Sequence, residues 1–105
     1  MNPILILTTT STEEEARLIA LTLVEERLAA CVNLLPGVTS IYRWKGNTET
    51  SPEVSLTIKS SRELWNTVRE RIRKLHSYEC PEIIAIPVIE SDPDYLKWWQ
   101  EGLER

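Results

Sequence analysis

One short run of residues carries most of the side chains in this sequence that could take part in chemistry. The run is His76-Ser77-Tyr78-Glu79-Cys80-Pro81-Glu82, and it combines an imidazole, a phenol, a thiol and two carboxylates. Imidazole and thiolate suit copper, whereas carboxylates alone would suit harder ions. Because such groups are costly to bury without partners, their concentration indicates a ligand site or a contact between subunits.

A second interpretation of His76 follows from its position after an expected helix. A cation at the C-terminal end of a helix is stabilised by the helix dipole, so His76 is equally suited to cap that helix. It is also the only histidine among the 105 residues, so one chain cannot build a site from several histidines. Chains that assemble would supply one histidine each, or would pair His76 with Glu79 or Glu82 of a neighbouring copy.

The two cysteines, Cys31 and Cys80, lie far apart and match no zinc-ribbon or redox motif. Cys31 beside Ala30 is typical of a small buried apolar residue, with metal ligation as the alternative. Cys80 precedes a proline in an expected loop, so we expect an exposed thiol that can bind a metal or become oxidised.

Composition and charge exclude several classes of protein. Apolar residues make up 42% and charged residues 27% of the 105 positions, which is typical of one globular domain covering residues 1–105. The net charge of −4 argues against general nucleic-acid binding. The N-terminal segment has no basic start and no long apolar stretch, so we expect no signal peptide and no membrane span. We therefore expect a cytoplasmic location with reduced cysteines.

The strands that would position these residues are continuous or alternating apolar segments. They are expected at residues 3–9, 30–44, 53–59 and 83–89. Pro36-Gly37 predicts a bend or bulge within the long second strand, and Pro87 predicts that the last strand is at an edge or carries a bulge. A turn signal at residues 45–48 makes the second and third strands an antiparallel pair.

Three helices are expected from capping residues followed by apolar stripes at helical spacing. A cap at Ser11 or Thr12 predicts a first helix that ends near residues 28–30. A second capping box at residues 60–63 predicts the start of the second helix. Asp92-Pro93 predicts a short third helix, since proline is favoured in a first turn.

The resulting order, βαββαβ with a terminal helix, predicts an α+β ferredoxin-like fold with the first two helices on one face of an antiparallel sheet. The other face is then bare in a single chain. The second strand is much longer than usual, so its hairpin extends beyond the domain and exposes unpaired edges. Both features predict a homo-oligomer.

Several functions that this fold supports elsewhere are not favoured by the residues. The first and third strands carry none of the aromatic residues that an RNA-recognition domain uses for stacking. The loop after the first strand has neither the CxxC of a heavy-metal carrier nor, before Arg17, the arginine of an acylphosphatase. A hydrolase would have only His76, Glu79 and Glu82 as acid–base groups, and the sequence places no nucleophile beside them.

Five segments resemble the CutA family of divalent-cation tolerance proteins, in the family's order and over nearly the whole chain. They are residues 23–33, 40–46, 53–59, 76–82 and 95–98. The run from His76 to Glu82 is similar to the family signature HPYExPE. Ser77 stands where proline is usual, and Cys80 stands where an apolar residue or threonine is usual.

The resemblance implies a homotrimer of ferredoxin-like subunits, architecturally similar to PII signalling proteins. It implies binding of divalent metal ions, divalent copper in particular, and a role in metal tolerance. The family has no accepted catalytic activity, so we expect no enzyme. We also expect no cofactor to be required for folding, and no nucleic-acid or membrane partner.

The resemblance also implies two sets of site residues. The candidate metal ligands are His76, Cys31, Glu79 and Glu82 from the family pattern, together with Cys80, whose thiol that pattern does not include. The cleft between subunits is expected to include Asn33, Tyr42, Trp44, Glu53, Lys59, Tyr78, Tyr95 and Trp98. For the aromatic residues on the hairpin and the last helix, packing is favoured over ligand stacking. Glu53 and Lys59 share the polar face of one strand, and we expect each to pair with a partner across the cleft, with simple solvation of the sheet as the alternative. The alternative function is a PII-like regulator that binds a small ligand or partner protein in this cleft.

Overall fold

The computed structural model describes residues 1–105 as an α+β fold with a four-stranded antiparallel sheet and three α-helices. The strands are β1 (Pro3–Thr10), β2 (Cys31–Trp44), β3 (Asn47–Ser61) and β4 (Ile84–Pro87). The helices are α1 (Glu13–Glu25), α2 (Trp65–Leu75) and α3 (Pro93–Leu103), with a short 3-10 helix at Arg62–Leu64. The strand order β2-β3-β1-β4 confirms the expected split βαβ arrangement. None of the helices combines the length and apolar character needed to cross a membrane.

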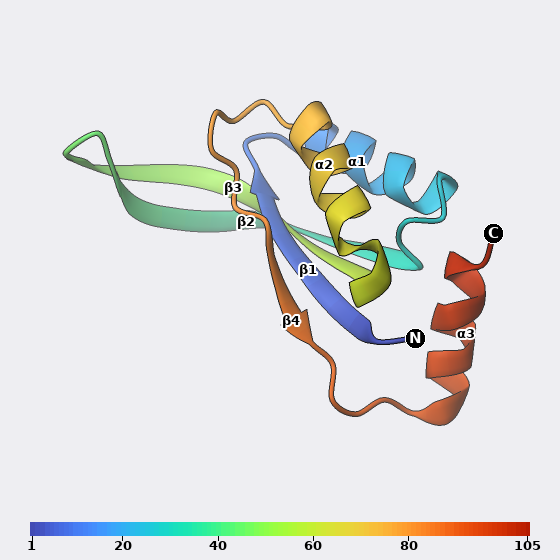
Figure 1. The fold of residues 1–105 in the computed structure, drawn as a ribbon. Coiled ribbons are helices and arrows are strands. Elements are labelled where there is room, and N and C mark those ends of the chain that lie inside the picture. The colour runs from blue at the N-terminus through green and yellow to red at the C-terminus, as the bar shows by residue number, and fades with distance from the viewer.

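The apolar core lies between the sheet and helices α1 and α2, which cover one of its faces (Figure 1). Buried and partly exposed residues alternate along β1 and along the second half of β3, because successive side chains of a strand point to opposite faces. The core side chains with no exposed surface are Ile6, Ala16, Ile19, Leu23, Leu56, Ile58, Val68 and Ile72. The predicted amphipathic pattern of both helices and of the third strand is therefore confirmed.

The opposite face of the sheet is largely uncovered, as expected for a single chain. The edge strand β4 leaves Ile84 and Ile86 49% and 44% exposed on this face. Helix α3 packs at the end of β3 instead, where Trp99 is buried and its indole Nε1 donates to the carbonyl of Ser60 at 3.0 Å. The expected start of α3 is confirmed, since Asp92 accepts at the helix N-terminus and Pro93 follows it.

Helix α1 begins as predicted but ends earlier. Thr12 is its cap, and the Thr12 hydroxyl accepts from the amide of Glu15 at 3.1 Å. The predicted end near residues 28–30 is wrong, because the last helical residue is Glu25. Arg27 adopts a left-handed conformation with φ of 57°, and Leu28 then donates to the carbonyl of Leu23. This reversal buries Leu28, an apolar residue that continued the helical pattern in the sequence.

The predicted capping box at residues 60–63 is also wrong. Both serines still belong to β3 and are buried, and Ser61 makes no capping hydrogen bond. The Ser60 hydroxyl donates instead to the carbonyl of Leu28 at 2.7 Å. The 3-10 helix follows, and α2 starts at Trp65. A serine hydroxyl can donate to a nearby buried carbonyl instead of accepting from a helix amide. The local sequence pattern does not distinguish these two roles.

Strands β2 and β3 form a hairpin that extends beyond the rest of the domain (Figure 1). The pairing shifts between Leu35 and Val38, where Gly37 has φ of 80°, so the predicted bulge is confirmed. The turn consists of Lys45 and Gly46, both with positive φ, which is the geometry of a tight hairpin turn. Strand β3 starts at Asn47 rather than residue 53, and β4 covers residues 84–87 rather than 83–89. The edge position predicted from Pro87 is confirmed.

Candidate functional site

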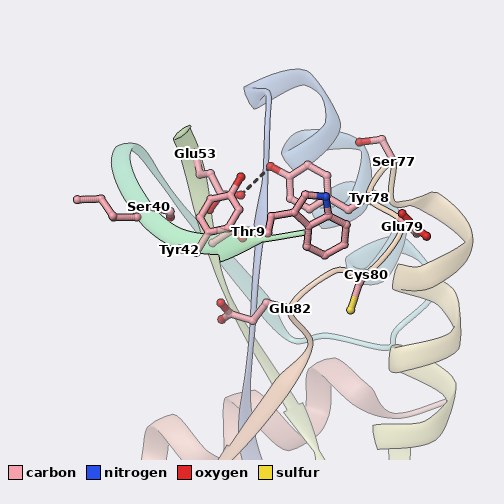
Figure 2. Close-up of a pocket in the computed structure, with 11 residues that line it drawn as sticks. Thr9, Ser40, Tyr42, Glu53, Ser77, Tyr78, Glu79, Cys80 and Glu82 are labelled. Atoms are coloured by element: carbon pink, nitrogen blue, oxygen red, sulfur yellow. Dashed lines mark hydrogen bonds between the residues drawn. The ribbon is translucent and has the colours of Figure 1, made fainter. Parts of the chain in front are cut away.

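An open groove of about 680 Å³ lies between the hairpin and the loop that joins α2 to β4 (Figure 2). Its lining residues come from β1, β2, β3 and this loop. They are Thr9, Ser40, Ile41, Tyr42, Trp44, Glu53, Ser77, Tyr78, Glu79, Cys80 and Glu82. Thr9 and Glu53 alternate with residues buried under the helices, so they point to the uncovered side of the sheet.

Glu53 and Tyr78 connect the hairpin to the loop. The Tyr78 hydroxyl donates to Glu53 Oε2 at 2.6 Å, a short bond to a charged acceptor (Figure 2). Burial alone would raise the pKa of Glu53, but hydrogen bonds from Ser40, Tyr78 and Thr9 lower that pKa overall. Burial and the bond to Glu53 raise the pKa of the Tyr78 phenol. The carboxylate therefore stays charged and the phenol stays protonated at neutral pH.

The ring of His76 is completely buried, with no exposed side-chain surface. Its Nε2 lies 2.7 Å from the carbonyl of Thr9, and Nδ1 lies 3.1 Å from the amide nitrogen of Tyr78. Since a carbonyl only accepts and an amide N–H only donates, the proton is on Nε2 and Nδ1 accepts. Both ring nitrogens are thus engaged, and this conformation leaves neither free for a metal. His76 positions the loop from which Tyr78 reaches Glu53.

Glu15 of α1 approaches the same imidazole. Its Oε2 lies 3.5 Å from His76 Nδ1, is buried, and has no hydrogen-bond partner. An ion pair between these atoms would require a proton on Nδ1, where the amide of Tyr78 already donates. The two contacts are therefore alternatives, and the shorter amide contact is the one with hydrogen-bond geometry.

The remaining candidate ligands of the loop, Glu79, Cys80 and Glu82, are exposed and line the groove. The predicted exposure of the Cys80 thiol is confirmed. Figure 2 shows the three side chains standing apart around the groove instead of converging on one point. No three histidine, cysteine or acidic side chains of the chain lie close enough together to hold one metal ion.

Cys31 lies outside the groove, in a cluster on the uncovered face of the sheet. Its Sγ lies 3.8 Å from Lys59 Nζ, which donates to Asn33 Oδ1 at 3.2 Å. The ammonium lies 5.4 Å from the centre of the Tyr95 ring. The Tyr95 side chain raises the pKa of Lys59 by hydrogen bonding, burial opposes the shift, and the Cys31 sulfur adds to it. Cys31 is half-buried, so it is not the enclosed apolar residue that its neighbour Ala30 suggested.

The structure therefore divides the predicted site residues between two places. The groove brings together Tyr42, Trp44, Glu53, Tyr78, Glu79, Cys80 and Glu82. The second cluster contains Cys31, Asn33, Lys59 and Tyr95, with Trp98 stacked on Tyr95 at 5.4 Å between ring centres. His76 belongs to neither surface, but it contacts the backbone of Thr9 and Tyr78, two residues that line the groove.

Sequence reasoning missed Thr9, Ser40 and Glu15. The hydroxyls of Thr9 and Ser40 help to lower the pKa of Glu53, and the polar end of the first strand was the only signal for Thr9. Ser40 becomes a neighbour of Glu53 through the hairpin pairing after the bulge. Glu15 lies in the first turn of α1, and nothing in its spacing indicates its contact with His76, 61 positions away (76 − 15).

Comparison with known proteins gives one consistent result. Residues 4–102 match the family model described as CutA1 divalent ion tolerance protein. A divalent-cation tolerance protein CutA from Thermus thermophilus is 47% identical over 97 residues, covering 92% of this chain and 94% of that protein. The mouse protein CutA is 48% identical over 92 residues, covering 88% of this chain but 52% of its own length.

Solved structures agree. The Thermus thermophilus divalent cation tolerance protein superposes with a TM-score of 0.94 at 45% identity, covering 97% of this chain and 99% of that chain. CutA from Xylella fastidiosa superposes with a TM-score of 0.95 at 40% identity, covering 99% and 100%. Family model, sequence relatives and fold all point the same way, so the chain belongs to the CutA1 divalent ion tolerance family.

Proposed function

We propose that this protein binds divalent metal ions, copper in particular, as its contribution to metal tolerance. One observation supports this best: the exposed thiol of Cys80 lines the same groove as the carboxylates of Glu79 and Glu82. A thiolate favours copper over harder ions, and the carboxylates add oxygen ligands and negative charge. His76 is not part of this proposed ligand set, because both of its ring nitrogens are engaged.

The proposed metal site is completed by a second copy of the chain. A single chain brings no three suitable side chains together, so Cys80 needs ligands from elsewhere. The uncovered sheet face carries exposed Ile84 and Ile86, and the hairpin extends beyond its own domain. Both features favour burial against sister chains, and we propose the homotrimer that the family resemblance implies.

We also propose a cytoplasmic location and the absence of a catalytic activity. A cytoplasmic location is consistent with Cys31 and Cys80, which are both free thiols. We propose no catalytic role. The groove contains no histidine, and the Tyr78 hydroxyl is engaged by the Glu53 carboxylate.

The test is a calorimetric titration with divalent copper of the wild type and two cysteine variants. Cys80→Ser should weaken binding at least tenfold, because it removes the soft ligand. Cys31→Ser is the matched control, since Cys31 belongs to the other cluster, and it should leave the affinity unchanged. If Cys80→Ser binds copper as tightly as the wild type, the groove is not the metal site.

A second candidate function is a PII-like regulator that binds a small anion, and the Lys59 cluster is the observation that favours it. Lys59 presents the only ammonium of this cluster, next to Asn33 and the Tyr95 ring, on the uncovered face. We expect Lys59→Ala to abolish any thermal shift caused by an anionic metabolite while copper binding survives. A screen of anionic metabolites that finds no stabilising compound would count against this function.

A further inference from the structure

One buried carboxylate oxygen of the chain takes no part in the groove. Glu15 Oε2 of α1 is enclosed by protein and has no hydrogen-bond partner, although the Glu15 side chain as a whole is 16% exposed. Buried polar atoms without a partner are rare, because each one has lost its water without a replacement. Such an oxygen in a native fold indicates a second state in which it is paired.

The atom that can pair with this oxygen is Nδ1 of His76, which lies 3.5 Å away on a fully buried ring. Nδ1 now carries no proton and accepts from the amide of Tyr78 at 3.1 Å, while Nε2 donates to the carbonyl of Thr9 at 2.7 Å. Nδ1 therefore cannot donate to Glu15 until it takes up a proton. Because Nε2 already carries a proton, this uptake converts the ring to the charged imidazolium form.

Protonation reverses the role of Nδ1. A protonated Nδ1 only donates, so it can no longer accept from the amide of Tyr78. The same proton gives Nδ1 a charged acceptor in Glu15 Oε2, and a hydrogen bond between opposite charges is stronger than the neutral contact that it replaces. The bond from Nε2 to the carbonyl of Thr9 is compatible with both states. One proton thus exchanges an amide partner in the loop for a carboxylate partner on α1.

The other titratable groups around the ring keep their charge while histidine changes its own, which in ordinary surroundings happens between about pH 5 and 8. Glu53 of β3 interacts with the ring electrostatically, but less than with its hydroxyl partners, which lower the pKa of Glu53 against the effect of burial. Tyr78 lies beside the ring, with ring centres 4.7 Å apart, and burial raises the pKa of its phenol. Arg73 and Lys74 precede His76 on α2 and are exposed to solvent. The exchange therefore depends on His76 and its buried acidic partner.

The loop that follows His76 responds to this exchange. Tyr78 is held at two points, since its amide donates to the ring of His76 and its hydroxyl donates to Glu53 on the hairpin at 2.6 Å (Figure 2). Loss of the ring acceptor leaves a part-buried amide unpaired, which is costly unless the backbone at Tyr78 moves to another acceptor. The start of the loop is therefore the segment that differs between the two states.

We propose that His76 and Glu15 form a pH-dependent switch that sets the position of the loop after α2. In neutral solution the uncharged ring holds the amide of Tyr78. In mildly acidic solution the charged ring donates from Nδ1 to Glu15 and releases that amide. All the contacts involved lie within one chain. Neither His76 nor the residues that its ring contacts belong to the proposed metal-ligand set, so the switch does not depend on the metal site.

Nuclear magnetic resonance of the nitrogen-15-labelled, metal-free protein between about pH 8 and 5 tests the switch. His76 is the only histidine, so the imidazole spectrum reports this ring alone. We expect a proton on Nε2 only at the upper pH and on both nitrogens at the lower pH. The backbone amide signal of Tyr78 should shift with the same midpoint as the ring. A ring that stays uncharged at the lower pH, or a Tyr78 amide that does not respond to the charged ring, would overturn the proposal.

Two variants identify the partner of the charged ring. Glu15→Gln removes the carboxylate charge at nearly constant size, and the ring should then take up its proton about one pH unit lower than in the wild type, because the cation has lost its oppositely charged partner. Glu14→Gln is the matched control, since Glu14 is an exposed neighbour on α1, and it should leave the midpoint unchanged. Equal midpoints in the two variants would show that Glu15 is not the partner and would reject the switch.

Discussion

His76 links three parts of the chain at the scale of a single residue. Its backbone amide ends α2 by donating to the carbonyl of Ile72 at 2.9 Å. Its ring binds the carbonyl of Thr9 on β1 and the amide of Tyr78 in the loop. His76 does not line the groove itself but contacts Thr9 and Tyr78, which do, so it acts as a positioning residue.

Replacing His76 should therefore reduce stability. His76→Ala leaves a cavity and removes the partners of one part-buried carbonyl and one part-buried amide, at a cost of about 2–4 kcal/mol in the free energy of unfolding. Urea denaturation monitored by circular dichroism measures this cost. Glu104→Ala, on an exposed terminal residue, is the control and should show no change. An unchanged midpoint for His76→Ala would contradict the positioning role.

Glu53 predicts a pH dependence whose sign follows from its lowered pKa. A carboxyl group with a lower pKa in the folded state stabilises the fold above its unfolded-state pKa, about 4.3 for glutamate. This contribution is lost as the pH falls through the folded-state pKa.

The wild type should accordingly exceed Glu53→Gln in stability by a constant amount between pH 6 and 8, and the difference should shrink below about pH 4. Urea denaturation at several pH values measures it. A stability difference that grows as the pH falls would show that the hydroxyls of Tyr78, Ser40 and Thr9 do not hold Glu53 in its charged form.

The hairpin of β2 and β3 is the element that shapes the groove, because it supplies Ser40, Tyr42, Trp44 and Glu53. Its geometry depends on two glycines, Gly37 at the bulge and Gly46 in the turn, with φ of 80° and 84°. No atom lies within 4 Å of where a side-chain Cβ would stand at either glycine. A substitution there is opposed by the backbone conformation alone.

Gly46→Ala should consequently destabilise the chain by about 1 kcal/mol, the usual cost of a left-handed conformation for a residue with a Cβ. Gly46→Asn is the matched variant, since asparagine tolerates this conformation, and it should cost less. Thermal denaturation of both variants compares them. Equal losses would mean that the turn does not require positive φ at this position.

Local patterns predicted most elements because each strand and helix carries its own signal. Thr12, Gly37 and Pro87 marked a cap, a bulge and an edge, and all three are confirmed. The errors at residues 28–30 and 60–63 have one cause: the chain reverses at Arg27, and Ser60 bonds across it to Leu28. That contact joins positions 32 apart.

The candidate site was less predictable than the fold for a similar reason. The loop from His76 to Glu82 was recognised by its composition, but its side chains separate in the structure. The ring of His76 turns inward while Glu79, Cys80 and Glu82 stay exposed. Spacing along a loop does not determine which side chains share a surface, whereas spacing along a strand does.

At the scale of the whole molecule, the chain is elongated, with extents of 45 × 25 × 23 Å, because the hairpin projects from a small sheet. One face of that sheet exposes Ile84 and Ile86 beside the Lys59 cluster. An apolar face and a projecting hairpin are both features that assembly would cover. The proposed trimer would bring the groove of one chain close to surfaces of another.

Light scattering after size-exclusion chromatography tests the assembly. The wild type should have about three times the chain mass of 12.1 kDa. Ile86→Asp places a charge on the face that the proposed trimer buries and should shift the mass towards that of one chain. Leu21→Asp, at a 61% exposed position on α1, is the control and should leave the mass unchanged. A wild type that elutes as one chain would contradict the proposed trimer.

The central claim is that divalent copper binds at Cys80 in the groove, and diffraction at the copper absorption edge from crystals grown with the metal tests it most directly. We expect an anomalous peak within about 2.3 Å of the Cys80 sulfur, with the remaining ligands supplied in part by a second copy of the chain. A peak at the Cys31 and Lys59 cluster, or no ordered peak near Cys80, would contradict the claim.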